Sequence, residues 1–110
     1  MSNWRYDSSK QGLETVFFDY EVEELKYLWG KGAENASSRE VNDHVKGKTQ
    51  ISRASVINSL NRMVEDGIMK YTEVSGKGGY RRLYTPVFDE AQMKKHIAEE
   101  LVQSIKSNLT

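Results

Sequence analysis

The segment from Ile51 to Gly67 constrains the fold and function of this chain more than any other stretch. At about 100° per residue its apolar side chains gather on one side of a helix. They are Val56, Leu60, Met63 and Val64, with Ile57 at the flank. The opposite side carries Ser52, Ser55, Asn58, Ser59 and Arg62. A solvated helix face usually carries Glu and Lys, whereas small hydrogen-bonding side chains suit base edges in a DNA major groove. We therefore predict a recognition helix, the alternative being an amphipathic helix with an ordinary polar face.

Two further helices are predicted before this segment. The first has Asp19 as its N-cap and stops at Gly30-Lys-Gly32, with an apolar stripe of Val22, Leu25, Leu28 and Trp29. The second opens with the capping box Ser37-Ser-Arg-Glu40 and ends near Gly47. Ser52 then caps the third helix and Gly67 ends it. Two helices joined by a short turn are the pattern of a helix-turn-helix.

A hairpin and one long helix follow the predicted recognition helix. Residues 68–74 and 80–85 are rich in strand formers, and the glycine-rich loop Ser75–Gly79 joins them into a wing that Pro86 closes. Asp89 caps a final helix over about residues 90–108. Its apolar face is too extensive to bury within a domain this small, so we expect a second subunit to cover it. The residues expected in this dimer contact are Met93, Ile97, Ala98, Leu101, Val102, Ile105 and Leu109.

These elements predict an α+β fold: a winged helix-turn-helix with a three-helix core, a two- or three-stranded wing and a long C-terminal dimerisation helix. Residues 1–16 are expected to be a loosely ordered N-terminal arm, whose Trp4 and Tyr6 dock on the body or on a partner subunit. Residues 17–87 would be the DNA-binding domain, and residues 88–110 the dimerisation helix.

Composition narrows the class of protein. A length of 110 residues suits one domain. No apolar run approaches the roughly 20 residues that span a bilayer, and the N-terminus lacks the apolar core of a signal peptide. The absence of Cys excludes disulfides and thiolate metal sites, so we expect a cytoplasmic protein without membrane contact. Residues 39–86 hold nine Lys and Arg against five Asp and Glu, a net +4 in a chain of zero net charge. This basic centre favours a DNA-facing surface.

Four stretches carry a family resemblance: Glu24-Leu-Lys-Tyr-Leu-Trp-Gly-Lys-Gly32, Ser38-Arg-Glu-Val41, Ser55 to Gly67, and Leu83-Tyr-Thr-Pro86. With them the chain resembles winged-helix repressors of the penicillinase-repressor (BlaI/MecI) family over residues 17–86. MarR-like repressors, which share the Ile-Ser-Arg-x-x-Val start and the glycine wing, are the near alternative. The resemblance implies a homodimeric repressor that acts by occupying its operator. Copper-responsive relatives use cysteines, which this chain lacks.

The predicted partner is a double-stranded DNA operator. Ser52, Ser55, Asn58 and Ser59 are expected at base edges, and Asn can pair bidentately with adenine. Lys48, Arg53 and Arg62 are expected at phosphates. In the wing, Lys77, Tyr80 and Arg81 would follow the backbone or enter the minor groove. Arg82 is expected to have a solvated or intramolecular partner instead.

Other functional classes have weaker support. His44 and His96 lie on different predicted helices without clustered ligands, so we expect no metal site and no cofactor. No catalytic arrangement stands out, which argues against an enzyme. One alternative is a winged-helix protein- or RNA-interaction module without sequence-specific DNA binding. Another is a repressor that senses an unknown small-molecule effector, in a pocket between the terminal helix and the body lined by Trp4, Tyr6 and Trp29.

Overall fold

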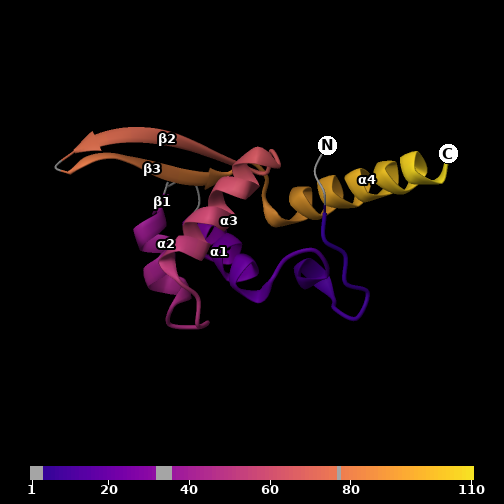
Figure 1. Ribbon diagram of the computed structural model, residues 1–110, viewed down its shortest axis with the longest axis horizontal. Helices are drawn as coiled ribbons and strands as arrows, with labels where there is room; N and C mark the ends of the chain where they lie inside the picture. Colours follow the sequence, from indigo (N-terminus) through magenta and orange to yellow (C-terminus); the bar gives the residue numbers. More distant parts are fainter. Residues whose placement is uncertain (1–3, 32–35, 77) are drawn as a thin grey trace.

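Three helices and a small antiparallel sheet form the body of the protein, and a long fourth helix extends away from it (Figure 1). The computed structural model describes residues 4–31, 36–76 and 78–110. The helices are η1 (Gly12–Thr15, a 3-10 turn), α1 (Asp19–Gly30), α2 (Ser38–Val45), α3 (Arg53–Glu65) and α4 (Glu90–Leu109). The strands are β1 (Ala36–Ser37), β2 (Met69–Gly76) and β3 (Gly79–Pro86), in the order β1-β3-β2. This arrangement confirms the predicted winged helix-turn-helix.

The core lies between α1, α2, α3 and the base of the sheet. Apolar side chains at helical spacing supply it, as predicted for α1 and α3, because each helix buries one face. The fully or almost fully buried members include Leu25, Leu28, Val41, Val45, Val56, Leu60, Met63 and Ile68. The recognition helix predicted from Ile51 to Gly67 is therefore α3, packed by its apolar face on α1 and α2.

The wing is the hairpin of β2 and β3, which are paired from Met69↔Pro86 to Gly76↔Gly79. Gly78 and Gly79 have φ values of 95° and 106°, a backbone region open mainly to glycine, so the glycines predicted for this loop are required by its geometry. The short strand β1 pairs with β3 and gives the sheet its third strand. Figure 1 shows the wing and α4 extending in opposite directions along the long axis of the molecule.

The helix ends follow the capping signals with one correction. Ser37 and Glu40 form the predicted capping box, and the Ser52 and Asp89 side chains accept hydrogen bonds from the N–H groups of Ser55 and Gln92. The prediction of Asp19 as the N-cap of α1 is wrong by one position. Phe18 is the N-cap, and its N–H donates to Glu21 Oε1 at 2.8 Å. The Glu21 side chain reaches back over the first turn and takes the place of a polar cap.

The N-terminal segment is packed on the body and is not a loosely ordered arm over its described part. Leu13, Val16 and Phe17 are buried in the core. Trp4 packs edge-on against Phe17 with ring centroids 5.7 Å apart, and its indole N–H donates to Glu100 Oε2 at 2.7 Å. Trp4 therefore docks on its own body, whereas Tyr6 is exposed. The apolar residues at positions 13, 16 and 17, spaced by a single 3-10 turn, anchor the segment.

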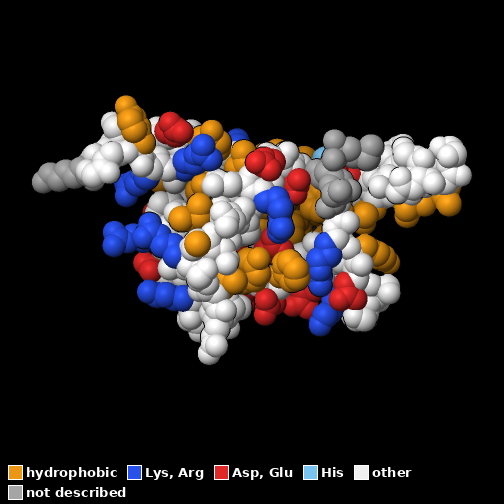
Figure 2. Space-filling view, viewed as in Figure 1, with side chains coloured by type: hydrophobic (Ala, Val, Ile, Leu, Met, Phe, Trp, Pro, Cys, Tyr) orange, Lys and Arg blue, Asp and Glu red, His pale blue; other side chains and the backbone are white. Residues whose placement is uncertain are grey.

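The apolar face of α4 divides into two parts. Met93 and Ile97 are buried within the same chain, so their predicted place in a dimer contact is wrong: the first turns of α4 complete the core instead. Leu101 is half-buried, whereas Ala98, Val102, Ile105 and Leu109 are exposed. Figure 2 shows hydrophobic side chains along one edge of this projecting helix. Each helix in the described ranges is too short or too polar to cross a lipid bilayer.

Candidate nucleic-acid interface

The exposed ridge of α3 holds part of the predicted reading face. Ser52, Arg53, Ala54 and Asn58 are exposed, and Ser55 is half-buried. The first turn of the helix is exposed, and its backbone N–H groups, apart from that of Ser55, which donates to Ser52, are of the kind that bind phosphate. Ala54 was missed by the sequence analysis, although a small apolar side chain in this position suits a thymine methyl group.

Ser59 does not belong to the exposed ridge, so its expected place at base edges is wrong. Its side chain is buried, and its Oγ lies 2.6 and 2.7 Å from the two carboxylate oxygens of Glu24 on α1. The same Oγ lies 3.0 Å from the carbonyl oxygen of Val56. The buried face of α3 is therefore wider than its apolar residues alone indicate. It includes Ser59, which is hydrogen-bonded to Glu24 on α1.

Glu24 is the most perturbed acid of this contact. It is fully buried, and burial, reinforced by nearby Glu21, raises the pKa of Glu24 to about 8. A serine hydroxyl has a single hydrogen to donate, yet three acceptor oxygens surround Ser59 Oγ. The Ser59 hydroxyl donates to the Glu24 carboxyl group, and the Val56 carbonyl is a further acceptor within reach. The pair therefore joins α1 to α3 through a buried hydrogen bond.

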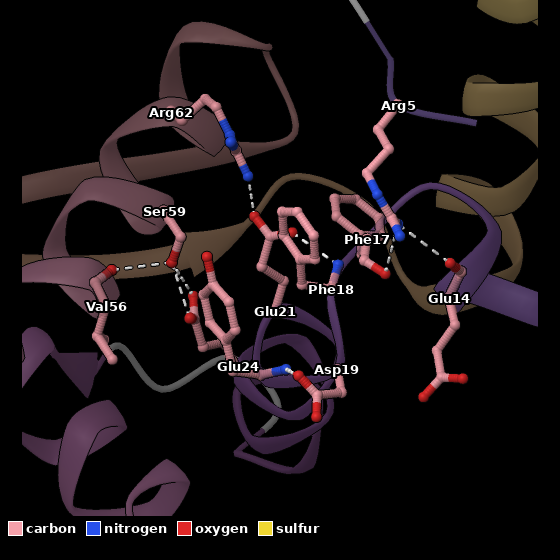
Figure 3. A network of polar contacts seen from close by, with 11 residues as sticks. Arg5, Glu14, Phe17, Phe18, Asp19, Glu21, Glu24, Val56, Ser59 and Arg62 are labelled. Atoms are coloured by element: carbon pink, nitrogen blue, oxygen red, sulfur yellow. Dashed lines mark hydrogen bonds and ion pairs between the residues drawn. The ribbon is translucent and has the colours of Figure 1, made fainter. Parts of the chain in front are cut away.

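Arg62 is about half exposed, and its guanidinium pairs with the Glu21 carboxylate, which is 1 % exposed (Figure 3). A phosphate contact by Arg62 would therefore have to share the guanidinium with Glu21. The burial of Glu21 and Glu24 was not predicted from the sequence. Their spacing with Leu25 and Leu28, at i, i+3, i+4 and i+7, is the signal that could have placed them on the inward face.

Asn61 joins α3 to the wing and was also missed. Its Oδ1 accepts hydrogen bonds from Tyr84 Oη at 2.6 Å and from Arg82 Nη1 at 3.1 Å. Arg82 also lies 4.1 Å above the Tyr71 ring and 3.8 Å from Glu73. Arg82 thus has intramolecular partners, as predicted. These contacts fix the angle between the hairpin and the exposed ridge of α3.

The outer part of the wing presents an aromatic and a cationic side chain. Tyr80 is 80 % exposed and Arg81 is exposed. Because side chains alternate along a strand, Tyr80 lies on the hairpin face that carries Arg82 and Tyr84, and Arg81 lies on the other. A narrow groove that admits the end of the hairpin would contact both. Lys77, predicted to act with them, lies outside the described residues.

Lys48 lies in the turn between α2 and α3, exposed and 3.8 Å from Glu23. Arg53 and Arg81 have no ion-pair partner within residues 4–31, 36–76 and 78–110. Figure 2 shows several Lys and Arg side chains at the wing end of the molecule and others near its centre. Lys48 and Arg53 flank the start of α3 and Arg81 is exposed on the wing, whereas Ser59 is buried.

The two histidines make contacts with aromatic rings. His44 stacks on Tyr27 with ring centroids 4.6 Å apart, and His96 lies 4.7 Å from the Phe88 ring. Where the chain is described, no three His, Cys, Asp or Glu side chains gather as metal ligands would. Trp29, considered as a pocket residue, donates its indole N–H to the carbonyl of Phe88 at 2.8 Å and so ties α1 to the start of α4.

Comparison with solved structures finds the same fold in proteins that are described as transcription regulators. A protein described as a possible transcriptional regulator from Methanosarcina mazei Go1 superposes with a TM-score of 0.65 at 17% identity, covering 84% of this chain and 73% of its own. A PadR family regulator from Clostridium difficile R20291 superposes with a TM-score of 0.53 at 16% identity, covering 82% of this chain and 93% of its own. A PadR-like transcription factor from Bacteroides fragilis superposes with a TM-score of 0.54 at 13% identity, covering 83% of this chain and 92% of its own. The shared feature is the winged-helix fold, the class to which this protein belongs.

The sequence itself identifies the family. Residues 19–109 match the penicillinase repressor family, and the chain belongs to that family. A comparison with curated protein sequences gives no match. The protein is therefore a DNA-binding transcription regulator and not an enzyme, as the sequence analysis predicted.

Proposed function

We propose that the protein is a homodimeric repressor that binds a pseudo-palindromic operator and blocks transcription by occupancy. The observation that carries this proposal is the combined surface of α3 and the wing. Ser52, Ala54 and Asn58 are exposed at the start of α3 and along it, and Tyr80 and Arg81 are exposed on the wing, which Asn61 ties to the same helix. Asn58 supplies base choice through its donor and acceptor pair, and Ser55 adds a hydroxyl. Such a regulator would work in the cytoplasm, where the genomic DNA lies.

Affinity would come from phosphate contacts. Lys48 and Arg53 are exposed cations that flank the start of α3, Arg81 is an exposed cation on the wing, and the N-terminus of α3 adds oriented N–H groups. Each phosphate contact releases condensed counterions, so binding weakens steeply as the salt concentration rises. Lys77 belongs to the same proposal on the sequence alone.

The second subunit would cover the exposed part of α4. A stripe formed by Val102, Ile105 and Leu109, exposed by 48%, 56% and 81%, is unpartnered in the monomer. Burying it against the same stripe of a second copy would remove this surface from water and hold two α3 helices at the roughly 34–36 Å spacing of successive major grooves. Ala98 and Leu101 would extend the same contact.

The test is fluorescence anisotropy with labelled duplex from upstream of the gene, titrated over a salt series against random duplex. We expect specific binding that outcompetes the random duplex and weakens with salt. Asn58→Ala should abolish the preference for the operator, and Gln103→Ala on exposed α4 should not change it. Binding to the operator by the Asn58 variant with unchanged preference would overturn the assigned reading face. Absence of binding at low salt would favour a protein-interaction module instead.

A further inference from the structure

A cavity of about 180 Å³ lies between the N-terminal segment and α3. It is separate from the exposed ridge of α3 and from the apolar stripe of α4. Its walls combine aromatic rings with charged side chains. The lining residues that matter here are Trp4, Arg5, Phe17, Phe18, Glu21 and Arg62. Figure 3 shows Phe17, Phe18 and Glu21 between the guanidinium groups of Arg5 and Arg62.

The charged side chains that line the cavity differ in how close their hydrogen-bond and ion-pair partners are. The Glu21 carboxylate accepts from the Phe18 N–H at 2.8 Å and pairs with Arg62, and Asp66 also has a partner. The Arg5 guanidinium, by contrast, has only long contacts: 3.3 and 3.4 Å to the carbonyl oxygens of Phe17 and Glu14, and 3.5 Å to Asp7. Its fork of donors matches a carboxylate that binds through both oxygens. The remaining N–H donors of Arg5 can therefore bind an anion.

The aromatic walls define the rest of the ligand. Trp4 and Phe17 meet edge-on with centroids 5.7 Å apart, and Arg5 lies 4.4 Å above the Phe18 ring. Aromatic rings pack well on such edges and faces. A cavity of about 150 Å³ accommodates benzene in another protein, so the volume here suits one ring with a short substituent.

We propose that this cavity binds a small single-ring aromatic carboxylate, with benzoate as the simplest example. The ring lies among Trp4, Phe17 and Phe18, and the carboxylate binds Arg5 and Arg62. Because Arg62 belongs to α3, a bound carboxylate competes with Glu21 for that guanidinium and alters how α3 is held on α1. Ligand occupancy is thereby coupled to the reading helix. Only this coupling rests on the proposed function; the binding itself does not.

The test is an amide NMR titration of the wild-type protein with three probes at matched ionic strength. Benzoate has the ring and the charge, benzyl alcohol has the ring alone, and acetate has the charge alone. We expect benzoate to give saturable shifts around residues 4–5, 16–18 and 62–63, and the other two probes to bind at least about tenfold more weakly. Arg5→Gln should weaken benzoate binding about tenfold. Lys10→Gln, a change of the same kind at an exposed site on the same segment, should leave it unchanged.

Three outcomes would overturn the site: no saturable shifts around the cavity, acetate binding as tightly as benzoate, or unchanged benzoate affinity in Arg5→Gln. Operator anisotropy with and without saturating benzoate then measures the coupling, with a change in DNA affinity expected. A protein that binds benzoate and no DNA would contradict the proposed function and leave the ligand site standing. A protein that binds DNA and no benzoate would do the reverse.

Discussion

The hydroxyl oxygen of Ser59 lies 2.6 and 2.7 Å from the two carboxylate oxygens of Glu24, and both residues are buried. This contact joins the first helix of the body to the helix that we propose reads DNA. Charged Glu21 and Arg62 lie beside it and link the same two helices. The seam between α1 and α3 is therefore polar where the sequence pattern indicated only apolar packing.

Stability should fall as the pH rises from about 4.5 to about 8, the ordinary and the folded-state pKa of Glu24. Across this window the folded protein retains a proton on Glu24 that the unfolded chain has lost, so each increase in pH favours unfolding. The stabilisation is complete below the lower pKa and lost above the higher one. Glu24→Gln keeps the shape without the charge, and should flatten the dependence and raise the free energy of unfolding near pH 8. Urea unfolding from pH 5 to 9 measures this. An equally flat profile in the exposed control Glu65→Gln would contradict the assignment.

Arg62→Ala should lower the free energy of unfolding by about 1–3 kcal/mol, because it leaves the buried Glu21 carboxylate without its cation. Arg53→Ala, at an exposed site on the same helix, should change it by less than about 0.5 kcal/mol. Urea unfolding at pH 7 compares the two. Adding Glu21→Gln to Arg62→Ala should recover part of the lost stability. If Arg62→Ala and Arg53→Ala lower the free energy of unfolding equally, the ion pair of Arg62 with buried Glu21 does not stabilise the fold. A loss of DNA binding in Arg62→Ala is accordingly no clean measure of a DNA contact.

Tyr84→Phe should lower the free energy of unfolding by about 1 kcal/mol, because the Asn61 amide oxygen loses the closer of its two partners. The matched change Tyr71→Phe affects a more exposed ring on the neighbouring strand and should be close to neutral. Thermal unfolding ranks the two variants. Amide hydrogen exchange in β3 should also speed up in Tyr84→Phe alone, since the hydroxyl ties the hairpin to α3. Identical exchange in both variants would show that Asn61 does not hold the wing.

Ile105→Glu should convert the proposed dimer to a monomer, because a carboxylate in the apolar stripe of α4 would be buried without a partner. Gln103→Glu adds the same charge at an exposed polar position two residues away and should leave the dimer intact. Light scattering during size-exclusion chromatography gives the mass of each variant. If the wild-type protein runs as a monomer at every concentration tested, the stripe has another role.

The sequence pattern was sufficient to predict the helices and strands, but not the buried polar contacts between them. Capping signals at Ser37, Ser52 and Asp89 acted locally, so they could be located from neighbours in the sequence. Ser59 and Glu24 are 35 residues apart, and only the crossing of α1 and α3 brings them together. Hydrophobic periodicity treats any serine or glutamate as an outward residue, so it placed Ser59 on the predicted DNA-reading face and did not predict the burial of Glu24.

The same reasoning accounts for the candidate interface. Asn58 was located correctly as exposed because it lies opposite the apolar face of α3, whereas Arg53 is exposed because it lies in the first turn, before the buried part of the helix. Asn61 was missed because its partners belong to the wing, 21 and 23 residues further along. For α4, periodicity identified the apolar face but not the point at which the body stops covering it. That point, between Ile97 and Val102, depends on where η1 and the core lie in space.

The contact between Trp4 and Glu100 spans 96 residues of sequence. During synthesis, Trp4 has no helix α4 on which to dock until residue 100 has been made. The aromatic wall formed by Trp4 and Phe17 is therefore among the last parts of the structure to be completed, after the three-helix body has its local contacts. A truncated or stalled chain that lacks α4 would expose the Trp4 side chain. Molecular chaperones could then bind this exposed aromatic ring.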